Sequence, residues 1–151
     1  MSSLTDRIRQ DIKAAMRQKD KATLSTLRLA LSAVQSKEMD TGSSLDDDGV
    51  IQVIASLLKQ RRDSAQQYRA GQRDDLAAKE EQEIAILSSY LPKQLSEHEI
   101  NEHIIAVIAQ HEASSMADMG KVMASLKPKL QGVADMQQVS KLVRQKLGGA
   151  S

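Results

Sequence analysis

The stretch Val50-Ile-Gln-Val-Ile-Ala-Ser-Leu-Leu-Lys-Gln-Arg61 decides the fold class of this chain. Its apolar side chains recur at intervals of three and four residues, which is the repeat of one helix face and not the alternation of a β-strand. The residues that form this face are Val50, Val53, Ile54, Leu57 and Leu58. The pattern continues to Ala70, and Gly71 is expected to end the helix because glycine is common just after helices.

The same spacing recurs on both sides of this stretch, and only two prolines and seven glycines interrupt the 151 residues. It predicts an all-α protein with seven helices and no strand. The expected helices cover about residues 4–17, 21–39, a stretch ending near 70, 74–90, the apolar run after Ser96, a short stretch between Asp118 and Lys127, and 136–147. Side chains suited to cap a first turn precede several of these helices, namely Asp20, Asp46, Ser96, Asp118 and Asp135.

The dipeptide Leu91-Pro92 is the strongest break in this pattern, because proline disfavours helical geometry in the residue before it. A capping box follows, in which Ser96 precedes Glu99 by three residues and an apolar run begins. We therefore expect an N-terminal bundle of about four helices, residues 1–91, and a smaller C-terminal domain of three helices, residues 92–151.

The composition excludes several classes of protein. The formal net charge is only +1, so attraction to a charged partner must come from a local patch. Two tyrosines and no phenylalanine or tryptophan exclude modules that stack nucleic-acid bases on aromatic platforms. The absence of cysteine excludes disulfide scaffolds, thiolate zinc sites, iron–sulfur clusters and cysteine nucleophiles.

No stretch of the sequence is typical of a membrane or secretory segment. The longest apolar run, residues 104–109, is far shorter than a membrane span. The first ten residues alternate in charge and contain no apolar signal-peptide core. We therefore expect a soluble, cytoplasmic protein with no membrane partner.

Four charged residues are aimed toward apolar helix faces. At 100° per residue, Arg61 lies about 20° from Val50, inside the apolar stripe of its helix. Arg28 borders the apolar stripe of the preceding helix, and Glu80 and Glu83 border that of the following one. Because an unpaired buried charge costs several kcal/mol, these four residues are expected to form a structural ion network. The alternative is a cleft that presents them to a ligand.

No set of residues has the spacing of an active site. The paired carboxylates lie at helix starts or on helices rich in lysine and glutamate, which caps and solvated faces explain. His98, His103 and His111 point in different directions around one helix, and Glu99 with His103 is better read as a surface pair than as metal ligands. Glycine-rich phosphate loops, nucleophile elbows and dinucleotide motifs are absent. We predict no catalytic residues, no metal and no cofactor.

Charge is segregated within the C-terminal domain. Residues 92–118 contain one basic and five acidic side chains, a net charge of −4, whereas residues 119–151 contain six basic and one acidic, a net charge of +5. On the last helix, Lys141 and Arg144 face away from the apolar side, and such a basic face suits phosphate contacts, which need no aromatic stacking. The alternative is a solvated face balanced by the acidic helix before it.

Four sequence segments between residues 27 and 147 resemble the GatB/YqeY family. They are Leu27-Arg-Leu-Ala-Leu-Ser-Ala-Val, Lys59-Gln-Arg-Arg-Asp-Ser-Ala-Gln-Gln-Tyr-Arg-Ala-Gly71, Leu91-Pro-Lys-Gln-Leu-Ser-Glu97 and Met119-Gly-Lys-Val-Met-Ala-Ser-Leu-Lys-Pro-Lys129. The resemblance implies a free-standing, all-helical YqeY-like protein. It also implies that the C-terminal domain is similar to the GatB tail of the glutamine-dependent aspartyl/glutamyl-tRNA amidotransferase, which contacts tRNA.

The turn Gly132-Val-Ala-Asp-Met136 departs from the family pattern, which often has arginine at the second position and glycine at the fifth. The tail resemblance covers residues 119–121 and the segment through Lys146. With the charge pattern, it makes these residues the expected tRNA-binding set: Gly120, Lys121, Lys127, Lys129, Lys141 and Arg144.

We therefore expect a non-catalytic tRNA-binding accessory protein that does not bind DNA. Two alternatives stay open. The chain could be a protein-interaction module whose bundle grooves hold a partner helix. It could instead assist a carbon–nitrogen ligase, the aminoacyl-tRNA amidotransferase that takes its nitrogen from glutamine.

Overall fold

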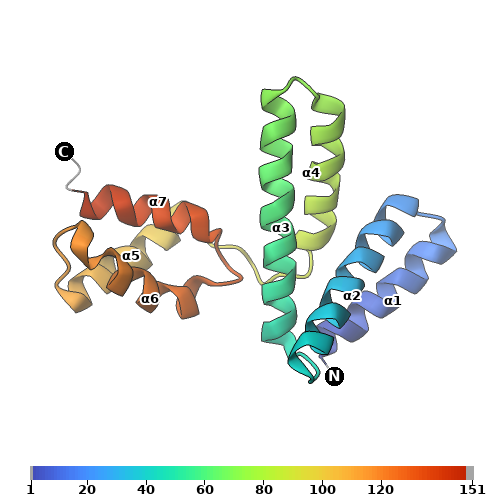
Figure 1. Ribbon diagram of the computed structural model, residues 1–151, viewed down its shortest axis with the longest axis horizontal. Coiled ribbons are helices and arrows are strands. Elements are labelled where there is room, and N and C mark those ends of the chain that lie inside the picture. The colour runs from blue at the N-terminus through green and yellow to red at the C-terminus, as the bar shows by residue number, and fades with distance from the viewer. Residues whose placement is uncertain (1, 149–151) are drawn as a thin grey trace. The chain divides into compact units, whose positions relative to one another are not determined.

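A computed structural model describes residues 2–148, which form seven α-helices and one short 3-10 helix (Figure 1). The helices are α1 (Ser3–Gln18), α2 (Lys21–Thr41), α3 (Asp47–Ala70), α4 (Asp74–Ser88), α5 (Glu97–His111), η1 (Met116–Asp118), α6 (Met119–Leu130) and α7 (Met136–Leu147). Within the described residues, pairing of the β type is limited to one isolated bridge between Gln131 and Ala134. The all-α prediction is confirmed.

Contacts divide the chain into two compact units, Met1–Leu91 and Pro92–Ser151. Each unit encloses its own apolar core. Below, these are called the N-terminal unit and the C-terminal unit.

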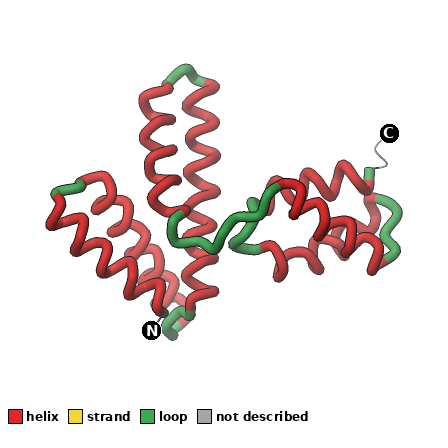
Figure 2. Tube along the Cα trace, turned by 180° about the vertical axis from the view of Figure 1, so that it is seen from behind, coloured by secondary structure: helices red, strands yellow, loops and turns green. Residues whose placement is uncertain are grey.

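The N-terminal unit consists of two helical hairpins, α1–α2 and α3–α4, which diverge from a common base (Figures 1 and 2). The first turn of α1, the end of α2 and the first turn of α3 meet at this base. The core here is made of aliphatic side chains that are almost completely buried, among them Ile8, Leu27, Val34, Ile54, Leu58 and Leu87. Burial of such side chains is the main driving force for packing the hairpins together.

The C-terminal unit packs α6 against both α5 and α7. Its core is aliphatic as well, with Ile104, Val122, Leu126, Val139 and Val143 each fully buried. A turn over residues 131–135 joins α6 to α7, and Gly132 adopts a φ of 87°, a conformation that favours glycine. The main-chain N–H of Leu95 and the side-chain amide of Gln94 donate to carbonyls of this turn, at 2.8 Å each.

Most predicted helix starts are found as expected. Asp20 accepts a hydrogen bond from the N–H of Thr23, and Asp135 accepts one from Gln137. Ser96 and Glu99 form the predicted capping box. Asp118 differs, because its carboxylate accepts from the N–H groups of Ser114 and Ser115 and so stabilises η1 and not the first turn of α6.

The predicted end of the sixth helix at Lys127-Pro128 is wrong, because α6 continues through the proline to Leu130. Proline removes one hydrogen-bond donor from the last turn. Leu130, however, is fully buried in the core of the C-terminal unit, and its burial holds this turn in place.

Candidate functional site

The five basic residues of the expected tRNA-binding set lie on α6 and α7, and all five side chains are exposed. Among residues 2–148, none of them takes part in an ion pair within 4 Å. Lys121 has one acidic neighbour, Asp118. The pKa of Asp118 is lowered chiefly by the N–H groups of Ser114 and Ser115, and the charge of Lys121 adds to this effect. These positive charges are therefore displayed to solvent and are not neutralised by ion pairs with other residues in the range 2–148.

The structure places Lys141 and Arg144 together on the outer face of α7. The inner face of this helix is fixed by Val139, Val143 and Leu147, which are buried. At 100° per residue, Lys141 and Arg144 lie about 60° apart and point away from that face. They form the most concentrated part of the basic surface.

The basic residues of α6 are spread more widely. Val122 and Leu126 face the core, so Lys121 points outward, whereas Lys127 and Lys129 lie on opposite flanks, about 160° apart. The structure thus does not bring the whole set onto one helix face. Gly120 is exposed, and a Cβ built on it would meet no atom within 4 Å, so the backbone is open to approach there.

A polar cluster joins α3 to α4 at mid-length. Arg61 is only 9% exposed, and its Nε lies 3.3 Å from Oε2 of Glu83 without hydrogen-bond geometry. One guanidinium nitrogen donates to the carbonyl of Leu57 at 3.3 Å. Burial is the main cause that raises the pKa of the Glu80 carboxyl; neighbouring Glu83 adds to this, and the positive charge of Arg61 opposes it. Three of the four expected network residues therefore lie together.

The fourth network residue, Arg28, does not join this cluster. It is exposed on α2, and its guanidinium lies 4.0 Å from the sulfur of Met16. The buried face of α2 is centred on Leu27, Ala30 and Val34, which turns Arg28 outward.

The histidines and carboxylates of α5 form other pairs than the expected Glu99–His103 surface pair. His98 contacts Glu102 at 2.8 Å, while Glu99 is part of the capping box and not paired with His103. Over the described residues, no group of three or more histidine or acidic side chains is placed to hold a metal ion.

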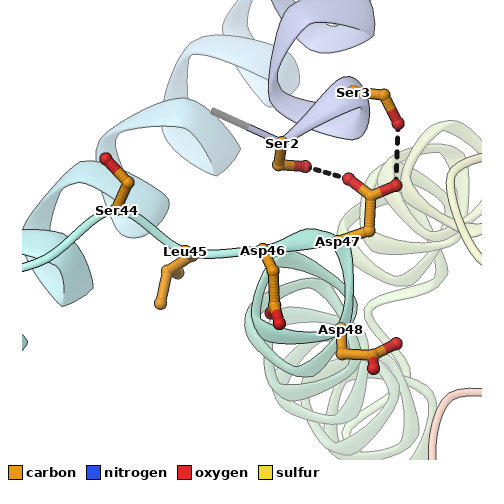
Figure 3. Close-up of a pocket in the computed structure, with 7 residues that line it drawn as sticks. All are labelled: Ser2, Ser3, Ser44, Leu45, Asp46, Asp47 and Asp48. Carbon is orange, nitrogen blue, oxygen red and sulfur yellow. Dashed lines mark hydrogen bonds between the residues drawn. The ribbon is translucent and has the colours of Figure 1, made fainter.

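A hollow of about 510 Å³ opens where α1 and α3 begin, and it is lined by Ser2, Ser3, Ser44, Leu45, Asp46, Asp47 and Asp48. Figure 3 shows the hydroxyls of Ser2 and Ser3 directed at Asp47, which also accepts from the N–H of Leu4 at 3.1 Å. These hydrogen bonds, that of Ser2 foremost, lower the pKa of Asp47. Asp46 in turn caps α3. The carboxylates here serve helix starts, which indicates a structural joint.

A contact that the sequence did not predict joins α1 to the end of α4. The hydroxyl of Tyr90 donates to Asp11, and the guanidinium of Arg7 lies 4.5 Å from the centre of the Tyr90 ring and donates to the carbonyl of Ser89. Burial, followed by the hydrogen bond to Asp11, raises the pKa of Tyr90. The i, i+4 spacing of Arg7 and Asp11 was the one signal available in the sequence.

Beside this contact, a groove of about 430 Å³ runs between α1, α2 and α4. Its lining includes the apolar residues Ala15, Leu27 and Ile86 and the carboxylates Asp11 and Asp20.

Among the curated relatives of this chain are yeast proteins named "Altered inheritance of mitochondria protein 41, mitochondrial". The protein of Vanderwaltozyma polyspora is 36% identical over 85 residues, which cover 56% of this chain and 46% of the relative. That of Kluyveromyces lactis is 34% identical over 111 residues, 71% of this chain and 60% of the relative. That of Lachancea thermotolerans is 32% identical over 111 residues, 72% of this chain and 59% of the relative. The chain thus spans about half to three fifths of the length of these relatives.

The names of these relatives overturn the expectation of a cytoplasmic protein, since each of them is called mitochondrial. That prediction rested on the lack of an apolar leader. Mitochondrial transit peptides are amphipathic and not apolar, so this criterion could not separate the two locations. Among the helices of residues 2–148, none is long and apolar enough to cross a membrane.

The family comparison covers nearly the whole chain. The family model described as "Yqey-like protein" matches residues 5–147, which include both units and every helix except the first residues of α1. The chain belongs to the YqeY-like protein family.

Proposed function

We propose that this YqeY-like protein is a non-catalytic accessory protein that binds tRNA through the basic surface of its C-terminal unit. The observation that carries the proposal is the display of five basic side chains on α6 and α7, exposed and outside any ion pair of the described residues. Binding of this kind draws its free energy from phosphate contacts and counterion release, and needs neither an aromatic platform nor an active site. The resemblance of this unit to the tRNA-contacting GatB tail of the amidotransferase supports the same proposal.

The proposed contacts follow from the geometry of the two helices. Lys141 and Arg144 engage neighbouring phosphates as a pair, and the planar guanidinium of Arg144 can donate two parallel hydrogen bonds to one of them. Lys121 adds a contact from α6, where the open surface at Gly120 lets the RNA backbone approach. Lys127 and Lys129 lie on opposite flanks of α6, so each contributes to a different part of the bound RNA.

The test is a titration of labelled tRNA at several salt concentrations with the double variant Lys141→Glu, Arg144→Glu. Each phosphate contact adds slightly less than one to the slope of log affinity against log salt, so loss of two contacts should lower that slope by about 2. The matched control is Lys13→Glu, Lys37→Glu, which changes the charge equally at exposed positions of α1 and α2. Unchanged affinity in the first variant would reject the basic surface as the tRNA site.

A second candidate function is protein interaction, and the groove between α1, α2 and α4 is the observation that favours it. A groove with a largely apolar lining suits the apolar face of a partner helix. A pull-down partner that is retained after ribonuclease treatment, and lost when Ala15 is enlarged to leucine, would support this function over RNA binding.

An accessory role in amidotransferase chemistry is a narrower form of the tRNA proposal. It requires that the chain raise glutamine-dependent conversion of mischarged tRNA when the other amidotransferase subunits are supplied, and that the chain alone produce none. No change in that rate on adding the chain would reject this role while leaving tRNA binding intact.

A further inference from the structure

The outer face of α5 combines an exposed apolar side chain with negative charge. Ile105 is 54% exposed, and Ala109 beside it is exposed as well. Glu102 lies on the same face, within about 60° of both residues, and Glu112 is exposed just after the last turn. The face thus combines apolar surface with negative charge, and a partner that is apolar and positively charged would be complementary to it.

The outer face of η1 and α6 has the complementary character. Met116 is 43% exposed, and it is followed at intervals of four residues by Gly120, Ala124 and Pro128, which are all exposed. Because a Cβ at Gly120 would meet nothing within 4 Å, the surface there is low enough to accept a bulky side chain from outside. The exposed Lys121 and Lys127 border this strip on its two sides.

We infer that the C-terminal unit binds a second copy of itself, with the α5 face of one copy docked on the η1–α6 face of the other. Charge complementarity selects this occupant. The α5 face carries Glu112 and Glu102, the second of which also contacts His98, whereas Lys121 and Lys127 border the η1–α6 face. Every copy therefore presents both an acidic apolar face and the basic apolar face that it fits.

The charged residues of the two faces are spaced differently along their helices. Glu102 and Glu112 are ten residues apart, about 15 Å along a helix, and Lys121 and Lys127 are six residues apart, about 9 Å. The long side chains of glutamate and lysine bridge this difference while Ile105 packs over the low surface at Gly120. A contact between single helix faces buries less than the roughly 800 Å² per partner of a standard interface, so this head-to-tail association is weak and transient.

The inference does not depend on tRNA binding, although Lys121 and Lys127 would serve both. The experiment is sedimentation velocity of the full chain, pretreated with ribonuclease, from about 10 µM to about 1 mM. We expect the weight-average sedimentation coefficient to rise with concentration in about 20 mM salt and to rise much less in about 500 mM salt, because ion pairs between the faces are screened.

Paired charge reversals make the test specific. Two double variants are needed. One reverses the α5 face, Glu102→Lys with Glu112→Lys, and the other reverses the η1–α6 face, Lys121→Glu with Lys127→Glu. Each should remain monomeric by itself, because both of its faces then carry charge of the same sign. An equimolar mixture of the two should associate again, since the acidic α6 face of one now fits the basic α5 face of the other. Ile105→Ser should weaken association at least tenfold without a change of charge, and the control Lys13→Glu, Lys37→Glu should associate like the original chain.

Three results would each overturn the inference. The chain could stay monomeric at the highest concentration in low salt. The mixture of reversed variants could fail to associate while circular dichroism shows that both are folded. Association could be lost on ribonuclease treatment, which would assign it to bridging nucleic acid.

Discussion

The two halves of the α3–α4 hairpin are held together by different means. In the half nearest the base, Val50, Ile54, Leu58 and Leu87 are fully buried and pack with α1 and α2. In the outer half, the buried apolar side chains are the small residues Ala65 and Ala77, and Arg69 of α3 forms ion pairs with α4.

Arg61 and Glu83 mark the boundary between these halves, and the pair of Arg69 with Glu81, at 2.6 Å, is the shortest ion pair of the outer half. Alanines let the helices approach closely, but they supply little apolar area. The base therefore stabilises the unit, whereas the outer half buries little apolar area of its own and depends on the base.

The largest effect is expected from Leu58→Ala at the base. This side chain is fully buried, so its truncation removes apolar burial and leaves a cavity. We expect the free energy of unfolding to fall by about 2–5 kcal/mol. Chemical denaturation measures this free energy. The control is Leu29→Ala on α2, where the leucine side chain is about half exposed. Equal losses in the two variants would contradict the assignment of the core to the base.

A smaller loss is expected from Arg61→Met at the boundary. The substitution fills the same space but leaves the partly buried Glu83 without its positive partner. Because Glu83 retains some solvent contact, we expect a loss of roughly 1–3 kcal/mol, below the figure for a fully buried pair. The double variant Arg61→Met, Glu83→Leu should recover most of the lost stability, because no unpaired carboxylate is then left at position 83. An unchanged fold in the single variant, together with loss of a bound ligand, would favour the cleft over the structural network.

Glu80→Gln should stabilise the protein at neutral pH. Since the pKa of Glu80 is raised in the folded state, folding favours its protonated form, and that contribution is lost as pH rises through the raised value. Glutamine keeps the neutral shape at every pH. The melting temperature of the variant should therefore exceed that of the original chain at pH 7, and the difference should vanish in acid below the ordinary glutamate pKa. Glu112→Gln, at an exposed position, serves as the control. A difference that grew toward acid would contradict this interpretation.

The smallest effect is expected from Arg69→Gln in the outer half. Both members of the Arg69–Glu81 pair are about half exposed, and such surface pairs contribute little to stability and are screened by salt. We expect the melting temperature to stay within experimental error in moderate salt and to fall slightly only in very low salt. If Arg69→Gln destabilised the protein as much as Arg61→Met does, the outer half would contribute as much to stability as the boundary, which would contradict this prediction.

Helix positions were predictable because each depends on residues close together in the chain. The capping box at Ser96, the caps at Asp20 and Asp135 and the break at Leu91-Pro92 are all local signals, and the structure contains them. The end of α6 was missed because the burial of Leu130 outweighs the local effect of proline.

The candidate sites were predictable only in part. The helical repeat correctly aimed Arg61 and Glu83 at one interior and turned Lys141 and Arg144 outward. The helical repeat also predicted that Arg28 joins the ion network, but this residue is exposed. The sequence shows where an apolar stripe lies on a helix, but it does not show which edge of the stripe a neighbouring helix covers. It also could not reveal Tyr90 with Asp11, which are 79 residues apart.

The amino-acid sequence alone was enough to predict most helix positions, although not the end of α6, most helix starts and the division of charge within the C-terminal unit. These properties arise from hydrogen bonds and side-chain repeats within a few residues. Which charges meet across helices, and which face solvent, depends on contacts between residues that are far apart in the chain. That outcome depends on how each helix is rotated against its neighbours, and this rotation is set by the packing of a whole core and by no short stretch of chain.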